Sequence, residues 1–207
     1  MKKLEAVILG VAFAPAPILF CLALIVSFCF FAGLLTDATG PYLALTALGV
    51  GIVINIIFLK KWVQKAYQLN NKAIIALYAF YSMIAFGVCM GIPLFNYILG
   101  IMAGVYIIRK MYYLKADETE YIRNIKKTAM FTAAVMLVLC CLMVLLGLAG
   151  KVNGKDFEVL FKSLFGLTFT INTAGFVSII FFGACAMVLL QYWLTRLSAK
   201  ITFKLSR

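Results

Sequence analysis

The sequence predicts an all-α integral membrane protein with six transmembrane helices and both termini in the cytoplasm. Of its 207 residues, 65% are hydrophobic and the mean hydropathy is +1.07, well above the roughly 45–50% apolar content of soluble domains. These residues form long uncharged runs, and basic residues gather in alternate segments between the runs. No polar segment is long enough for a separate soluble domain, so residues 1–207 are expected to form a single polytopic membrane domain.

The hydrophobic runs divide into six spans. Because a helix crosses the hydrocarbon core with roughly 20 apolar residues, we predict spans at residues 6–35, 42–59, 73–91, 95–108, 128–150 and 168–195. The first run is longer than one crossing requires, and it contains Pro15 and Pro17. Pro17 at a first helical position would start a shorter span, since the missing N–H costs nothing there. A kinked continuous helix is the alternative.

The third and fourth spans are predicted to form a tight central hairpin. The run from 73 to 108 carries no charge, and Pro93 breaks it because proline lacks an N–H and disfavours helix at the residue before it. Each arm carries a G-x-x-x-G motif, and the four glycines are Gly87, Gly91, Gly100 and Gly104. Folding about Pro93 places Gly87 opposite Gly100, where small residues would let the helices approach closely.

Signals between the spans predict three further helical features. Asn70 or Asn71 can cap the third span. Asp117 and Glu120 have the D-x-x-E spacing of a capping box, so a helix is expected to start there and run unbroken into the fifth span. Before the sixth span, the phenylalanines and leucines between 157 and 165 recur at helical spacing. This stripe predicts a short helix lying in the outer membrane interface.

The distribution of lysine and arginine predicts the orientation of the chain. Two basic residues lie at the N-terminus, 4 in residues 60–72, 6 in 109–127 and 4 in the C-terminal tail, which makes 16 on one side against 3 on the other. Basic residues accumulate on the cytoplasmic side of membranes. We therefore expect a multi-pass protein of the cell membrane, the inner membrane of a cell that has two, with both termini inside. The net charge of +12 reflects this topology and indicates no nucleic-acid partner.

The C-terminal tail is predicted to bind anionic lipid headgroups. A helix would place its four basic residues on one face, with leucine and isoleucine on another, and the four are Arg196, Lys200, Lys204 and Arg207. This arrangement suits a helix that bends into the cytoplasmic headgroup layer. An ordinary basic flank that only sets orientation is the alternative.

The residue types argue against an enzyme. The chain has no histidine, no G-x-S-x-G, no phosphate-binding glycine loop and no pair of acidic residues inside the apolar runs, so the usual catalytic and zinc sites lack their parts. The six cysteines lie in apolar runs and form no C-x-x-C. We expect no cofactor and no metal. A copper(I) site at Cys89-Met90 or at residues 140–143 is the alternative.

Uncharged polar residues at the outer ends of several spans predict a ligand pocket. Polar groups in hydrocarbon must find partners or face a water-filled space. The residues expected to converge on an outward-facing site for a small molecule are Asp37, Asn96, Thr170, Asn172 and Thr173. Interhelical hydrogen bonding as structural glue is the alternative for each of them.

The working hypothesis is a transport-related membrane protein, either a transporter or its ligand-binding subunit. A non-enzymatic subunit that binds another membrane protein or a second copy through its glycine faces is the alternative, and a membrane-embedded enzyme comes third. Ala12 and Ala16 have the A-x-x-x-A spacing of a docking motif, although Pro15 interrupts it. With its size, span count and orientation, the chain resembles the substrate-binding membrane subunits of energy-coupling-factor vitamin transporters. The resemblance assigns no further residue a role.

Overall fold

The computed structural model describes residues 9–10, 12–33, 39–88, 94–149 and 173–206, and the structural statements below concern these residues. They are helices joined by short turns, with no strand among them. The chain divides into two compact units, Met1–Leu77 and Tyr78–Arg207, with the boundary inside a helix. We call them unit 1 and unit 2 and describe each by itself. The single membrane domain expected from the sequence stays a prediction.

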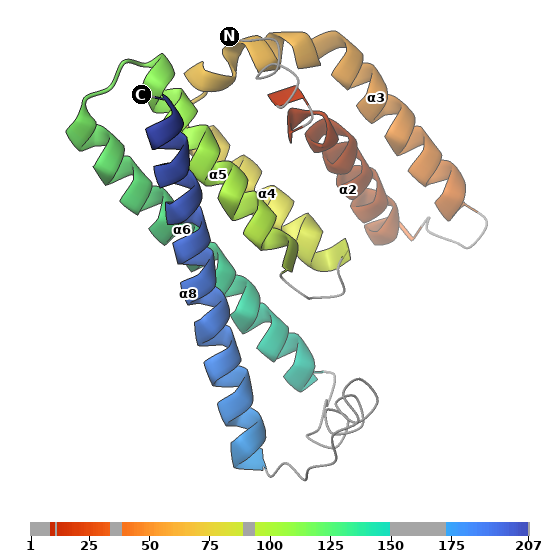
Figure 1. The fold of residues 1–207 in the computed structure, drawn as a ribbon. Helices are drawn as coiled ribbons and strands as arrows, with labels where there is room; N and C mark the ends of the chain where they lie inside the picture. The colour runs from red at the N-terminus through yellow and green to blue at the C-terminus, as the bar shows by residue number, and fades with distance from the viewer. Residues whose placement is uncertain (1–8, 11, 34–38, 89–93, 150–172, 207) are drawn as a thin grey trace. The chain divides into compact units, whose positions relative to one another are not determined.

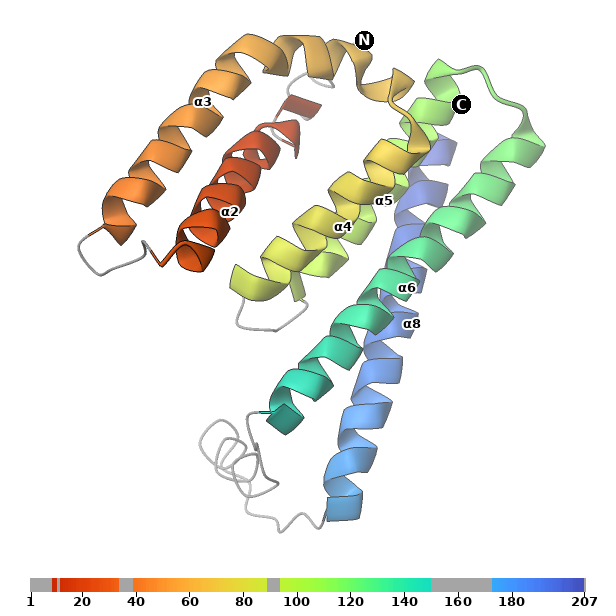
Figure 2. The same ribbon diagram turned by 180° about the vertical axis from the view of Figure 1, so that it is seen from behind.

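Unit 1 is built on a helical hairpin. Helix α2 covers Pro15–Phe31 and α3 covers Gly40–Lys65, followed by the short 3-10 helix η1, Ala66–Gln68. The two long helices lie side by side (Figures 1 and 2). Residues 9–10 and 12–13 are also helical, and a single turn residue, Ala14, separates them from α2, which starts two residues before Pro17. Pro15 is tolerated there because the first residues of a helix have no intrahelical acceptor for their N–H groups.

Small residues set the distance between α2 and α3. The buried residues Ala47, Gly51 and Asn55 follow one another at four-residue spacing along α3. A Cβ atom added to Gly51 would lie 2.6 Å from the Cα atom of Ile18, so the two backbones are in contact there. One turn further, Asn55 Nδ2 donates a hydrogen bond of 2.7 Å to the carbonyl of Ala14. This is the close small-residue packing by which helices associate in lipid.

Unit 2 contains most of α4 (Asn71–Val88) and all of α5 (Leu94–Tyr113), α6 (Glu118–Ala149) and α8 (Thr173–Ser206). Helix α4 ends at Val88 and α5 begins at Leu94, and the predicted break at Pro93 lies between them, outside the described residues. Asn70 caps α4, since its Oδ1 accepts a hydrogen bond from the Lys72 N–H at 3.2 Å. Helix α6 follows Asp117 and runs for 32 residues without interruption, as the capping signal predicted.

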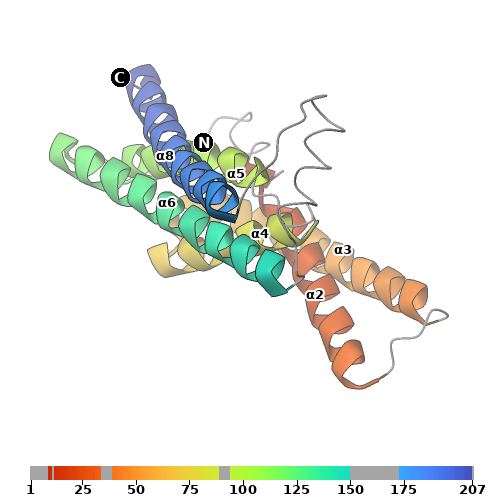
Figure 3. The ribbon, with the colours of Figure 1, turned by 90° about the horizontal axis from the view of Figure 1, so that it is seen from below.

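Helix α8 lies against both α5 and α6 (Figures 1 and 3). It runs parallel to α5, because Gly100 faces Gln191 and Gly104 faces the following turn at Ser198. It runs antiparallel to α6, because Thr132 meets Thr195 and Tyr121 meets Phe203. With 34 and 32 residues, α8 and α6 are longer than the 20-residue α5, and the pair extends past its N-terminal end (Figure 1).

The expected pairing of the two hairpin arms through their glycines is wrong. A Cβ atom on Gly87 would meet nothing within 4 Å among the described residues, whereas the nearest neighbours of Gly100 and Gly104 all belong to α8. The small face of α5 is therefore used for close approach, as predicted, but toward the last helix of the chain. Gly91 lies outside the described residues.

The C-terminal tail continues α8 as the same helix, so the bend expected from the sequence does not occur. One of its faces packs inward: Ala199 is buried in a cluster with Tyr121 and Ile125 of α6, and the rings of Phe203 and Tyr121 lie 4.8 Å apart. The basic residues Arg196, Lys200 and Lys204 are exposed. Arg207 and the predicted interfacial helix between 157 and 165 lie outside the described residues.

Three helical segments are long and apolar enough to cross a membrane: Gly40–Gln68, Glu118–Leu145 and Val177–Leu205. Two shorter apolar helices cover Pro15–Cys29 and Asn71–Gly87. Many large hydrophobic side chains on the long helices point outward, among them Ile56, Leu145 and Phe182. Such exposed apolar surface suits contact with lipid.

Candidate functional site: a buried polar cluster in unit 2

Six uncharged polar side chains from four helices are buried together in unit 2. We call them the polar cluster; they are Tyr78 and Ser82 of α4, Asn96 of α5, Thr132 of α6, and Gln191 and Thr195 of α8. Buried polar groups are costly unless they are hydrogen-bonded. Their gathering at one place therefore makes this cluster the strongest candidate for a site.

Asn96 is the centre of the cluster. Its Oδ1 accepts a hydrogen bond from Ser82 Oγ at 2.7 Å and a longer one from the Tyr78 hydroxyl at 3.4 Å. Its backbone carbonyl accepts a hydrogen bond of 3.1 Å from Gln191 Nε2. Gln191 Nε2 also donates to the Tyr78 hydroxyl at 3.4 Å. Asn96 thereby joins α4, α5 and α8.

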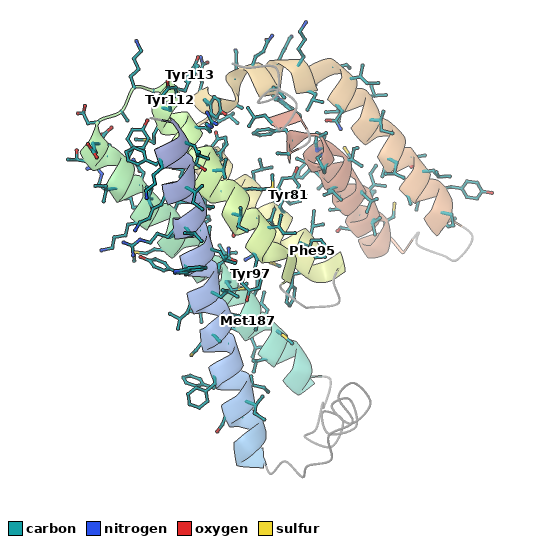
Figure 4. The ribbon with its side chains drawn as sticks, viewed as in Figure 1. Tyr81, Phe95, Tyr97, Tyr112, Tyr113 and Met187 are labelled. Atoms are coloured by element: carbon teal, nitrogen blue, oxygen red, sulfur yellow. The ribbon has the colours of Figure 1, made fainter. Side chains whose placement is uncertain are left out.

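A hydroxyl pair extends the cluster to α6. The Oγ1 atoms of Thr132 and Thr195 lie 2.9 Å apart, and either can donate. Thr132 Oγ1 also lies within hydrogen-bonding distance of the Ala129 carbonyl, at 3.1 Å. Near the same level, the hydroxyl of Tyr97 on α5 donates to the carbonyl of Met187 on α8 at 3.5 Å, and these two residues lie close together in Figure 4.

The cluster residues of α5 and α8 belong to two helix faces on which buried residues recur every four positions. Asn96, Gly100, Gly104 and Ile108 form one buried face of α5, and Gln191, Thr195 and Ala199 form the facing side of α8. A Cβ atom on Gly100 would collide with Gln191 Nε2 and would lie 2.8 Å from Thr195 Oγ1. The absence of a side chain at Gly100 thus leaves the space in which the Gln191 amide lies.

Two polar atoms of the cluster have no hydrogen-bond partner among the described residues: Asn96 Nδ2 and Gln191 Oε1. Both side chains are almost completely buried, with 1% and 0% of their surface exposed. One is a donor and the other an acceptor. An unpaired buried group typically costs 1–3 kcal/mol, so pairing these two atoms with a further polar group would be favourable.

The outward-facing pocket predicted from the sequence is not assembled in the described part of the chain. Of its five residues, Asp37, Thr170 and Asn172 lie outside the described residues. Thr173 is the first residue of α8 and precedes Gln191 by 18 residues, about 27 Å along a helix. Because Asn96 is bonded to Gln191, Asn96 and Thr173 do not share a site. In the structure Asn96 makes interhelical hydrogen bonds, and the outward-facing pocket stays a prediction.

Sequence reasoning missed five of the six cluster residues. Ser82, Thr132, Gln191 and Thr195 are uncharged polar residues in or beside apolar runs, and Tyr78 could pass for an ordinary aromatic residue. The four-residue repeat of polar or small residues in 191–199 was the available signal, because it marks one helical face. Which helix that face meets could not be read from the repeat.

Of the two positions of the copper(I) alternative, Cys89-Met90 lies outside the described residues and residues 140–143 lie within α6. Cys21, Cys29, Cys140, Cys141 and Cys185 are free thiols, and no group of three or more His, Cys, Asp or Glu side chains in the described ranges could hold a metal ion.

Fold and cluster together define a class: an all-helical protein with helices able to cross a membrane and a buried, uncharged polar cluster. Comparison of the chain with protein-family models, with curated proteins and with solved structures finds no match. The polar cluster is therefore the feature of the described residues that indicates a function.

Proposed function

We propose that the protein is a transporter, or the ligand-binding membrane subunit of one, and that it binds an uncharged polar solute at the polar cluster. The observation that carries this proposal is the buried amide pair, Asn96 and Gln191, with one donor and one acceptor left unpaired. Structural glue in a membrane bundle gains its energy by pairing polar groups with each other. Two unpaired amide atoms at its centre favour a binding role instead.

The composition of the cluster favours an uncharged solute. All six side chains are neutral amides, hydroxyls or a phenol, and no acidic or basic side chain is among them. A charged solute in this cluster would need an opposite charge to offset its desolvation.

For the chain as a whole, we propose six spans with both termini in the cytoplasm, on the strength of the 16 to 3 distribution of basic residues. Each predicted span overlaps one of the helices α2 to α6 and α8. Accessibility labels at residues 71 and 153 should then report opposite sides of the membrane. Labels on the same side would contradict the topology without touching the cluster.

The test of the functional proposal is mass spectrometry of what the protein retains after mild purification from its own membrane. Wild type and the Asn55→Leu control, which changes a buried amide in unit 1, should both retain the same uncharged polar solute. Gln191→Leu should lose it. If wild type retains no small molecule but a stable non-transport membrane protein, the interaction-subunit alternative is correct and the proposal is wrong.

A further inference from the structure

We infer that the polar cluster recognises a carboxamide or urea group, through Asn96 Nδ2 and Gln191 Oε1. This inference rests on the proposed function and names the class of solute that the same site would take. It follows from which hydrogen-bonding atoms the cluster has already used and which two remain.

The hydrogen bonds fix the orientation of the Gln191 amide. Its polar neighbour at 3.1 Å is the backbone carbonyl of Asn96, which can only accept. The side chain must therefore present its N–H group there, and its second neighbour, the Tyr78 hydroxyl, accepts the other hydrogen. Both hydrogens of Nε2 are used, and Oε1 is left as an unpaired acceptor.

In the structure, the oxygen of the Asn96 amide faces two hydroxyls. Ser82 Oγ and the Tyr78 hydroxyl both approach Asn96 Oδ1. Tyr78 receives a hydrogen bond from Gln191, so its own hydrogen is available for Asn96. This consistent direction of donors leaves Asn96 Nδ2 with two unused hydrogens.

A carboxamide complements this remaining pair. Its carbonyl oxygen can accept from Asn96 Nδ2, and its N–H group, on the adjacent atom of the same planar group, can donate to Gln191 Oε1. Urea offers the same two groups. A carboxylate has no donor, an ammonium group has no acceptor, and a single hydroxyl must use one oxygen for both roles. Sites built on buried hydrogen bonds strongly reject analogues that leave one of the groups unpaired.

The experiment measures binding of radiolabelled acetamide to the full-length protein in lipid nanodiscs by equilibrium dialysis. Wild type should bind acetamide saturably, and unlabelled urea should compete. Acetate, methylammonium and ethanol should compete at least about tenfold less well, the change expected when one hydrogen bond to a buried group is lost. This comparison requires no variant, so it cannot be confused with a folding defect.

Variants then assign the binding to the two atoms. Asn96→Leu removes the donor and should weaken acetamide binding by about tenfold or more. Asn55→Leu is the matched control, because Asn55 is also a buried asparagine with an unpaired oxygen but lies in unit 1. It should bind acetamide as wild type does.

Three outcomes would overturn the inference: no saturable binding of acetamide, equal competition by acetate or ethanol, or equal weakening in the two variants. Failure here is distinguishable from failure of the proposed function. A retained solute that is uncharged but has no amide would contradict the carboxamide assignment and leave the transport proposal standing. If the protein binds acetamide but retains only a non-transport partner, the carboxamide assignment stands and the transport proposal is wrong.

Discussion

At the scale of single residues, Gly100 decides where the amide of Gln191 can lie. Any side chain at this position would occupy the space that the amide and the Thr195 hydroxyl use. A side chain at Gly104, one turn later, would collide with the Ser198 hydroxyl. It would also place its Cβ atom 2.5 Å from the Thr195 carbonyl oxygen. Glycine is required at both positions by the close approach of α8.

Gly100→Leu should therefore destabilise unit 2 more than Gly87→Leu. Overpacking a close contact typically costs 1–3 kcal/mol, and Gly100→Leu would also displace the hydrogen bonds of Gln191. Gly87 is exposed, with open space beside it among the described residues. Thermal unfolding in detergent should show a fall of several degrees for Gly100→Leu alone. Equal shifts for the two variants would contradict the close packing of α5 on α8.

Lys115, in the turn that follows α5, has a strained backbone conformation. Its φ of 52° lies in the left-handed region, and the Ala116 N–H donates to the Met111 carbonyl at 3.1 Å, the pattern of a Schellman motif. A residue with a Cβ atom costs roughly 1–2 kcal/mol there, whereas glycine does not.

Lys115→Gly should accordingly raise the free energy of unfolding by about 0.5–1 kcal/mol, after the larger chain entropy of glycine is subtracted. Lys126→Gly, in the interior of α6, is the control and should lower it by about 1 kcal/mol. A loss of stability in Lys115→Gly would mean that the side chain, rather than the backbone conformation, matters at this turn.

At the scale of helices, the Thr132–Thr195 pair measures how strongly α6 and α8 are held together. The two hydroxyls are fully buried and 2.9 Å apart. Interhelical hydrogen bonds in membrane bundles contribute about 0.6 kcal/mol on average. A double-mutant cycle with Thr132→Val and Thr195→Val should give a coupling energy near that value. If the free-energy changes of the two single variants add exactly in the double variant, the hydrogen bond between the hydroxyls contributes no stability.

The C-terminal part of α8 combines an inner face that packs on α6 with an outer face of exposed cations. We expect Arg196, Lys200 and Lys204 to hold anionic lipid, at about 1 kcal/mol for each charge near the membrane surface. Replacing all three with glutamine should reduce phosphatidylglycerol adducts in native mass spectrometry. The same change at Lys60, Lys61 and Lys65 of α3, which are also exposed, is the control. If both triple variants lose phosphatidylglycerol adducts equally, the tail binds lipid no better than any basic flank, and the expectation is wrong.

At the scale of the whole molecule, the sequence was sufficient for helix positions but not for helix partners. Each predicted span overlaps a helix, and Asp117 located the start of α6, because a capping signal acts within one turn of the chain. The glycines of α5 predicted close packing. Their partner was misassigned, because a G-x-x-x-G face can pack on any helix face made of small residues. The sequence does not show that α8 is the helix beside α5.

The site was harder to predict for the same reason. Asn96 was expected in an outer pocket because it follows Pro93 closely along the chain. In the structure it is level with Gln191, 95 residues later. Ser82, Thr132 and Thr195 carry no motif of their own, and only their convergence from three helices gives them meaning. Such convergence is a property of packing, which no local pattern records.

The position of α8 at the end of the chain has a consequence for biosynthesis. The Asn55–Ala14 bond of unit 1 can form as soon as α3 has entered the membrane, since both partners lie in the first 55 residues. In unit 2, the small face of α5 and the Thr132 hydroxyl of α6 meet their partners only in the last helix. Until the ribosome has made α8, the small face of α5 and the hydroxyl of Thr132 lack their partners from α8, and the preceding helices are open to quality-control proteases. A chain that stops before residue 173 should be degraded rapidly in pulse–chase experiments, and supplying α8 as a separate segment should protect it.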